Sequence, residues 1–480
     1  MNDLLLNGTI GDLSNAIRAR KVSIREIAAF YVARIGAVDR AGIKLNAVRE
    51  LAPDIEREAV RLDEEFAAGR PRGPLHGIPV LLKDNIMTAD GLRASAGVAA
   101  LADFKPMREA TIVKRLRAAG ALVLGKTNLT EFADYVSDVM PSGFSGAGGR
   151  VKNPLTGEEY GRGLGSSVGS AASVAASLAP FAIGSETQNS IQSPALASSI
   201  VGFKPSTGLV SRAGIIPLVP SQDSPGPLAR TVEDLVLVLS AIAGADTADT
   251  LGLECLHDIP AQLEPLPPRQ IRVGIPRRAM ADRPDFVDAM AAFHAAIDEL
   301  RKSGVTIVDP CDLPAAEQLQ DVRSSVFRTE FKAAIDAFLI ENESPCGIDS
   351  LQSLIAWNER HPDAIPYGQS LLLAAQATGG LQDRQYRLDR RRDIYLARRA
   401  GIDAATKLGD VDVLMTPMAA AAKCTGKAGA PALAIPIGKG ADGAPFGVTL
   451  YAPRGKDIKL LQIGLTLFSI LGERIKVTLC

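Results

Sequence analysis

Histidine, cysteine and tryptophan are scarce in this chain of 480 residues, which contains four, five and one of them. The histidines are His76, His257, His294 and His361. None of them stands at the spacing of a metal-binding motif, and no His-Glu-x-x-His pattern occurs. We therefore expect no metal site, and we also expect no other cofactor. His76 lies near Lys83 in the sequence, but a structural role is favoured for it.

The chain contains no Cys-x-x-Cys pair. Its cysteines are odd in number: Cys255, Cys311, Cys346, Cys424 and Cys480. This pattern favours free thiols over a disulfide framework. The first residues lack a basic segment followed by a long apolar one, which argues against a signal peptide. The most membrane-like run, Leu460–Leu471, is too short to span a bilayer and predicts a buried helix. We expect a cytoplasmic protein that does not bind membranes.

The chain also has no large excess of charge of either sign, because it contains 53 basic and 54 acidic residues. A net charge of −1 gives no electrostatic reason to bind nucleic acid or an anionic membrane. The expected partner is therefore a small or peptidic substrate, and the sequence is compatible with a homodimer. Length alone favours two to four domains.

Short runs of branched apolar residues alternate with helical patterns from about residue 75 onward, after a segment at residues 10–66 that reads as helices. The runs expected to be strands are Ile78–Leu82, Ala121–Leu124, Phe181–Ile183, Ile271–Ile275, Val411–Met415 and Ala432–Ile435. Helical patterns such as Ala110–Ala119 and Ala171–Ala179 lie between several of them. The alternation predicts an α/β fold, with a mixed central sheet covered by helices on both faces. Reactive groups then belong where strands end.

Lys83 stands at the end of one apolar run, in Gly-Ile-Pro-Val-Leu-Leu-Lys-Asp-Asn at residues 77–85. Burial of a lysine is expensive in its charged form, so a buried lysine tends to become a neutral amine that can act as a base. The alternative is a lysine that reaches solvent and pairs with Asp84. On this segment alone, the alternative is favoured.

Two serine-rich segments follow. Residues 165–170 read Gly-Ser-Ser-Val-Gly-Ser, and the ordinary explanation of such a cluster is a helix cap or a flexible linker. Residues 184–194 read Gly-Ser-Glu-Thr-Gln-Asn-Ser-Ile-Gln-Ser-Pro, directly after a predicted strand. A serine in such a loop can face a substrate while successive backbone N–H groups converge on an oxyanion. A polar turn explains the same residues.

Together the segments are far more specific, and residues 75–235 resemble the amidase signature family, whose members use a Ser–cis-Ser–Lys triad. The resemblance rests on Gly77-Ile78-Pro79 and Lys83-Asp84-Asn85, residues 115–127 with Asn128 and Glu131, Gly165-Ser166-Ser167, Ser190-Ile191, Gly202 to Ser206, and Asp223 with Gly226 to Asp234. It extends weakly over most of the chain and implies one domain, 1–480, in place of several. The signature core is then about 75–235, and a helical region at about 311–405 shapes the substrate pocket.

The resemblance also implies a role for each matching residue. Ser190 is the nucleophile, Lys83 is the base, and Ser166 bridges them after a cis Gly165–Ser166 peptide bond. The oxyanion hole is formed by the backbone N–H groups of Thr187, Gln188, Asn189 and Ser190. Ser170 supports the lysine, and the Thr187 side chain is a further supporting contact.

Three positions depart from the family pattern: Gln188 and Asn189 stand where glycines are common, and Val168 replaces a usual glycine. Asparagine tolerates a positive φ, whereas a valine there would be strained. Residues 142–149 with Asn153-Pro154, and residues 208–212 with 215–217 and 221–223, look most like those of peptide amidases, which release ammonia from C-terminally amidated peptides. The resemblance therefore predicts hydrolysis of peptide or small amides. The alternatives are the amidase subunit of a tRNA-dependent amidotransferase and a ligand-binding member without turnover.

Overall fold

The structure is a computed structural model, and it describes residues 1–249, 258–280, 290–344 and 346–477. Of the five cysteines, Cys255 and Cys480 lie outside the described residues, as does His257. In the described part, Cys311, Cys346 and Cys424 are free thiols. No helix in that part is long and apolar enough to cross a membrane.

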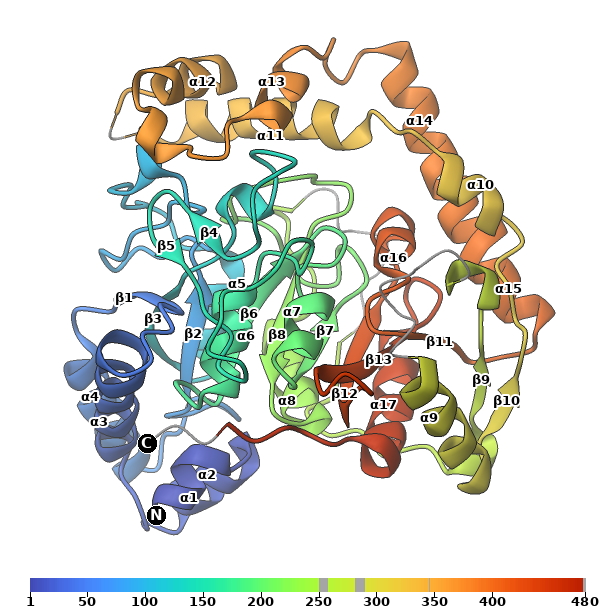
Figure 1. Cartoon of the computed structure of the whole chain (residues 1–480). Coiled ribbons are helices and arrows are strands. Elements are labelled where there is room, and N and C mark those ends of the chain that lie inside the picture. Colours follow the sequence, from blue (N-terminus) through green and yellow to red (C-terminus); the bar gives the residue numbers. More distant parts are fainter. Residues whose placement is uncertain (250–257, 281–289, 345, 478–480) are drawn as a thin grey trace.

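One eleven-stranded sheet runs through the molecule (Figure 1). In spatial order its strands are β1 (Val48–Leu51), β3 (Leu122–Thr127), β2 (Pro79–Lys83), β6 (Phe181–Glu186), β8 (Ser224–Ala229), β7 (Val201–Lys204), β12 (Ala432–Lys439), β13 (Pro445–Tyr451), β11 (Val413–Pro417), β9 (Arg272–Gly274) and β10 (Thr306–Val308). Strand β2 is parallel to β3 and β6, and β9 is parallel to β10 and β11, whereas the other neighbours are antiparallel. The predicted mixed sheet is thereby confirmed. A separate small hairpin pairs β4 (Phe144–Ser145) with β5 (Gly149–Arg150).

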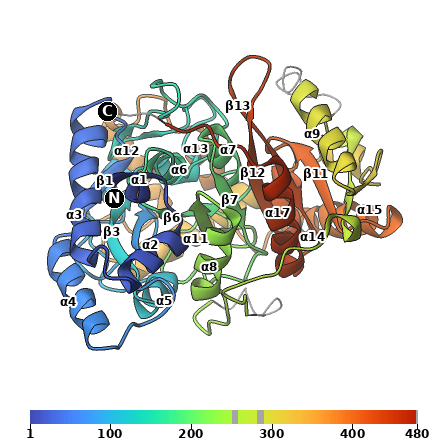
Figure 2. The same cartoon turned by 90° about the horizontal axis from the view of Figure 1, so that it is seen from below.

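Helices cover both faces of the sheet, as predicted (Figure 2). One face carries α6 (Val168–Ala175) and α7 (Gln192–Ala197); the other carries α5 (Thr111–Ala118), α8 (Val232–Ile242), α9 (Met290–Lys302) and α17 (Asp457–Leu471). Helix α17 contains the apolar run Leu460–Leu471 and is largely buried, as expected. Helices α3 (Ile24–Arg34) and α4 (Ile55–Ala67) lie at the β1 end of the sheet, and α1 (Asn2–Asn7) and α2 (Ile10–Arg18) lie below them in the view of Figure 1. The prediction of helices throughout residues 10–66 was therefore wrong at β1.

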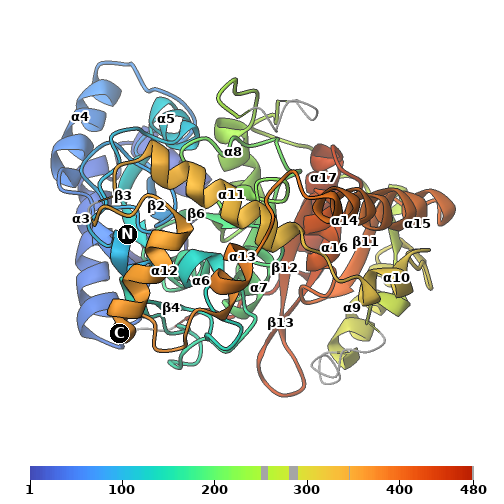
Figure 3. The same ribbon diagram turned by 90° about the horizontal axis from the view of Figure 1, so that it is seen from above.

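The helical region forms a layer above the sheet (Figure 3). Its helices are α10 (Ala316–Asp321), α11 (Val326–Glu341), α12 (Leu351–Arg360), α13 (Ser370–Gln376), α14 (Arg384–Ile394) and α15 (Asp403–Leu408), and α16 (Ala422–Ala428) follows β11. Short helical turns are η1 (Ile35–Ala41), η2 (Ala99–Leu101), η3 (Glu131–Ala133), η4 (Pro268–Gln270), η5 (Arg277–Met280), η7 (Pro362–Ala364) and η8 (Tyr395–Ile402). Beneath this layer, a second apolar cluster packs Phe331 of α11 on Phe132 and Tyr135 at ring distances of 5.4 and 5.0 Å.

Residues 120–127 read Gly-Ala-Leu-Val-Leu-Gly-Lys-Thr, which matches the letters of a phosphate-binding loop. The structure places Leu122–Thr127 in β3 instead, and Lys126 is fully buried with its amine on the carbonyl of Ile86. A strand of this kind offers no cradle of backbone N–H groups to a phosphate. The segment is therefore part of the core.

Candidate active site

Three separate segments bring Lys83, Ser166 and Ser190 to one edge of the sheet. Lys83 is the last residue of β2, Ser166 precedes α6, and Ser190 lies in the turn between β6 and α7. Because β2 and β6 are parallel neighbours, their carboxyl ends meet at the same edge. Nζ of Lys83 lies 2.6 Å from Oγ of Ser166, and all three residues are buried.

Ser185 holds the other side of the lysine. Nζ of Lys83 donates to the Ser185 carbonyl at 3.2 Å and lies 3.0 Å from its hydroxyl oxygen. Nδ2 of Asn85 donates to the same hydroxyl at 3.0 Å. Sequence reasoning gave no role to Ser185 or Asn85. Both residues lie at the carboxyl ends of two predicted strands, and parallel pairing of these strands would have indicated that the two side chains are neighbours.

The electrostatic setting of Lys83 favours a neutral amine. Burial lowers the pKa of Lys83 from 10.5 to about 7, although the carboxylates of Asp223, Glu186 and Asp134 act to raise it. At this pKa a substantial share of the amine is neutral near neutral pH. The alternative that Lys83 reaches solvent and pairs with Asp84 is wrong, because Asp84 instead forms an ion pair with Arg49 at 3.0 Å.

Backbone contacts lock Ser166 against the Ser190 turn. The N–H of Ser167 donates to the Ser190 carbonyl at 3.1 Å, and the N–H of Thr130 donates to the Ser166 carbonyl at 3.1 Å. Gly165 has φ of +81°, and a Cβ at this position would lie 2.8 Å from the Asn189 oxygen and from Cα of Ser190. Only glycine combines this backbone conformation with such a close approach.

The expected cis peptide bond before Ser166 is not found. Within the described residues the cis bond is Asp309–Pro310, and Gly165–Ser166 is trans. The positive φ of Gly165 makes the turn instead, and Lys83 still reaches Ser166. In the described part of the chain, the Ser190 hydroxyl has no hydrogen-bond partner. The segments of Ser166 and Ser190 are therefore held together through the backbone, by the hydrogen bond from the Ser167 N–H to the Ser190 carbonyl.

The turn at residues 187–190 presents four successive backbone N–H groups, at Thr187, Gln188, Asn189 and Ser190. Among the described residues, none of the four donates to a protein acceptor. The next two N–H groups, of Ile191 and Gln192, are held by Oε2 of Glu186 at 2.6 and 2.9 Å. This buried carboxylate therefore fixes the turn and leaves the preceding donors available to a ligand.

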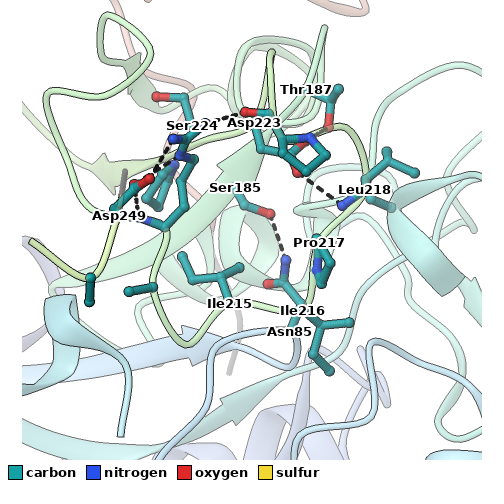
Figure 4. A pocket seen from close by; sticks show the side chains of 16 residues that line it. Asn85, Ser185, Thr187, Ile215, Ile216, Pro217, Leu218, Asp223, Ser224 and Asp249 are labelled. Atoms are coloured by element: carbon teal, nitrogen blue, oxygen red, sulfur yellow. Dashed lines mark hydrogen bonds and ion pairs between the residues drawn. The ribbon is translucent and has the colours of Figure 1, made fainter. Parts of the chain in front are cut away.

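The two supporting residues behave differently. Oγ1 of Thr187 donates to Oδ1 of Asp223 at 2.6 Å, and Oδ2 of Asp223 accepts from the N–H groups of Leu218 and Val219, each at 2.9 Å. Figure 4 shows this carboxylate between Thr187 and Leu218. Ser170 does not contact Lys83: its hydroxyl lies 2.9 Å from that of Thr127 and donates to the Ile183 carbonyl at 3.3 Å. A supporting role of Ser170 for the lysine therefore stays a prediction without a direct contact behind it.

The three departures from the family pattern are accommodated without strain. Val168 is the first residue of α6, and neither it nor Asn189 has a positive φ, so the expected strain at Val168 does not arise. Nδ2 of Asn189 donates to the Gly163 carbonyl at 2.9 Å. The amide of Gln188 lies 3.5 Å from that of Gln222.

Two hollows flank the 187–190 turn. The smaller, of about 200 Å³, is lined by Asn85, Ser185, Thr187 and Asp223 among others (Figure 4). The larger, of about 720 Å³, is called the groove here and is lined by Gly163, Gln188, Asn189, Met418, Ala420, Lys423 and Phe446 among others. A groove of this size accepts a short peptide or a drug-sized molecule.

The helical region is tied to the site through Glu330 of α11. Oε2 of Glu330 accepts from the N–H of Ser221 at 2.9 Å, and Oε1 accepts from the hydroxyl of Tyr386 at 3.0 Å. Ser221 belongs to the loop whose Asp223 holds Thr187. The hydrogen bonds of Glu330, the loop backbone from Ser221 to Asp223 and the hydrogen bond of Thr187 therefore link α11 and α14 to the 187–190 turn.

The chain is similar in sequence and in structure to known amidases. The family model Amidase matches residues 26–428. The crystal structure of the peptide amidase PAM in complex with the competitive inhibitor chymostatin has a TM-score of 0.90 and 37% identity, and the match covers 98% of this chain and 99% of that one. The native peptide amidase from Stenotrophomonas maltophilia has a TM-score of 0.88 and 37% identity, with 98% of each chain covered.

Relatives with similar sequence identity to this chain include amidases and amidotransferase subunits. A probable amidase of Arabidopsis thaliana is 32% identical, and the match covers 95% of this chain and 88% of the relative. A glutamyl-tRNA(Gln) amidotransferase subunit of Ralstonia pickettii is 34% identical, with 95% of this chain and 96% of the relative covered.

Proposed function

This chain belongs to the amidase family and is an amide hydrolase, and from that premise we propose that it works through an acyl-enzyme formed on Ser190. Lys83 is the base and Ser166 carries the proton between them. The observation that supports this most is the 2.6 Å contact between a fully buried lysine amine and the Ser166 hydroxyl. A neutral Lys83 can accept the Ser166 proton, and Ser166 then accepts that of Ser190.

In the first half-reaction, Oγ of Ser190 attacks the amide carbon while its proton moves through Ser166 to Lys83. The negative oxygen that results is met by the N–H groups of residues 187–190. Collapse breaks the carbon–nitrogen bond, and the proton held by Lys83 returns through Ser166 to the departing amine. Water then attacks the ester, and Ser190 is released with its proton restored.

The experiment that tests this proposal measures ammonia release by the purified chain from small and peptide amides. Turnover should be lost in Ser190→Ala and in Lys83→Ala. Ser173→Ala, a change within α6 away from the triad, serves as the matched serine control and should keep wild-type turnover. Full turnover in Ser190→Ala would remove Ser190 from the mechanism.

The substrate class that we propose is a small amide or a C-terminal peptide amide. The support is the similarity to peptide amidases over nearly the whole chain and a groove large enough for a short peptide. No ammonia release from amidated dipeptides, acetamide or benzamide would contradict this class. Greater release from the dipeptides would favour peptide amides within it. The reverse preference would favour small amides.

A second candidate is the amidase subunit of an amidotransferase, favoured by the 34% identity to such a protein. A subunit of that kind delivers ammonia within a complex, whereas a free-standing hydrolase turns over alone. The third candidate, a ligand-binding member without turnover, rests on Gln188 and Asn189. Turnover by the isolated chain contradicts the third candidate and argues against the second.

We also propose a cytoplasmic protein that binds neither nucleic acid nor membrane and that is able to form a homodimer. The free thiols of Cys311, Cys346 and Cys424 fit a reducing compartment. The near-zero net charge gives no attraction to polyanions. Fractionation, light scattering and a nucleic-acid binding assay test these three points.

A further inference from the structure

A third hollow of about 530 Å³ lies between α10 and α16, and we call it the rear cavity. It meets the groove at Ala420 and Lys423, which line both. Its walls include the apolar side chains of Leu313, Leu319 and Val322. This volume is typical of sites for small organic molecules.

Tyr451, at the end of β13, lines the rear cavity and is fully buried. Within the described residues its hydroxyl has no hydrogen-bond partner. Burial raises the pKa of this phenol well above its ordinary value, so the group stays protonated and is able to donate. A buried hydroxyl without a partner costs free energy, which an acceptor on a ligand recovers.

The rim of the rear cavity carries more positive than negative charge. Lys427 is already paired with Asp393 at 3.0 Å. In the described part of the chain, the side chains of Lys423 and Arg323 form no ion pair or hydrogen bond, and the one further carboxylate at the rim is Asp321. Two uncommitted cations therefore face one uncommitted anion.

From this combination we propose that the rear cavity binds a small organic carboxylate, with its apolar body between α10 and α16 and its carboxylate within reach of Arg323, Lys423 and the Tyr451 hydroxyl. An apolar wall suits the body of such a ligand. Arginine and a neutral hydroxyl donor suit its carboxylate.

The rear cavity is also connected to the catalytic turn through α16. A Cβ on Gly426 of this helix would lie 2.4 Å from the Thr187 carbonyl, so the helix and the turn are in close contact. A carboxylate is the class of acid that amide hydrolysis releases. Feedback by such a product on hydrolysis rests on the proposed function, whereas binding of a carboxylate in the rear cavity does not.

Cys424 gives a direct readout, because this partly exposed residue lines the rear cavity. Burial raises the pKa of its thiol to about 12, so its alkylation is slow and is followed over hours at pH 9. Cys346 is exposed elsewhere and serves as an internal control. The wild-type chain is treated with N-ethylmaleimide with and without 4-phenylbutyrate, and alkylation of each cysteine is followed by mass spectrometry. We expect 4-phenylbutyrate to slow alkylation of Cys424 by about tenfold at saturation and to leave Cys346 unchanged. The neutral 4-phenylbutanol should protect weakly.

Two variants locate the ligand. Tyr451→Phe and Arg323→Ala should each raise the concentration of 4-phenylbutyrate needed for protection by about tenfold, the loss expected for one hydrogen bond to a charged group. Arg391→Ala, a change on the exposed surface of α14, should behave as the wild type. The proposal is overturned if Cys424 is not protected, if the alcohol protects equally, or if both variants retain wild-type protection. None of these readouts requires turnover, so they remain valid even if Ser190 is not the nucleophile.

Discussion

The amine of Lys83 lies 2.6 Å from the hydroxyl of Ser166 and is fully shielded from solvent. A charged ammonium would be expensive in this position, and its hydrogen-bond partners within 3.2 Å are serine oxygens rather than carboxylates. Burial of Lys83 therefore favours the neutral amine, which is the form that accepts a proton.

The rate should follow the protonation of Lys83. Burial lowers the pKa of Lys83 to about 7, and the neutral amine is the active form. Below this pKa, kcat/KM should fall by about tenfold per pH unit, and above it kcat/KM should level off. A pH profile measured on one amide substrate checks this. A rate that rises as the pH drops from 8 to 6 would contradict a lysine base.

Gly165 should be intolerant of any side chain. Gly165→Ala places a Cβ 2.8 Å from the Asn189 oxygen in a backbone with φ of +81°, so activity should fall by about a hundredfold or more. Gly157→Ala is the matched control, because Gly157 has φ of +75° but nothing within 4 Å of its Cβ. Both changes carry the cost of a left-handed backbone, about 1–2 kcal/mol. Equal kinetic losses in the two variants would attribute the effect to the backbone alone.

The hydrogen bond from Thr187 to Asp223 should matter to kcat. Thr187→Val removes the 2.6 Å bond that fixes the start of the 187–190 turn, and kcat should fall by about tenfold with little change in KM. Thr187→Ser keeps the hydroxyl and should restore most of the rate. A wild-type kcat in Thr187→Val together with a slow Thr187→Ser would show that packing of the methyl group, rather than the hydrogen bond, governs the turn.

Loss of Glu330 should loosen the link between the helical region and the site. Glu330→Ala leaves the Ser221 N–H and the Tyr386 hydroxyl without their acceptor, which costs about 1–3 kcal/mol of the free energy of unfolding. We also expect a higher KM, because the loop that carries Asp223 is released. Urea titration and steady-state kinetics measure both effects. Glu343→Ala, on the exposed surface after α11, should change neither, and an unchanged KM in Glu330→Ala would separate this loop from substrate binding.

Sequence patterns predicted the central strands because those strands are continuous apolar runs. All six predicted runs overlap strands, from β2 to β12. Strand β8 was missed because Ser-Pro-Gly-Pro-Leu-Ala reads as a loop, yet β6 and β7 pair with it on either side. Tertiary pairing overrode local propensity there.

The site shows the same division between local and distant information. Lys83, Ser166 and Ser190 stand in recognisable motifs, and the sequence alone identified them as candidates. Contacts between distant segments were less accessible, such as that of Thr187 with Asp223 or of Glu330 with Ser221. Nothing in the letters of these segments encodes which side chains become neighbours after folding.

The central claim is that Ser190 is the nucleophile activated by Lys83, and covalent labelling tests it most directly. The intact chain is treated with phenylmethylsulfonyl fluoride, and the modified residue is mapped by mass spectrometry. We predict one sulfonyl adduct, on Ser190, that is absent in Ser190→Ala and forms far more slowly in Lys83→Ala. An adduct on another residue, or undiminished labelling in Lys83→Ala, would contradict this account.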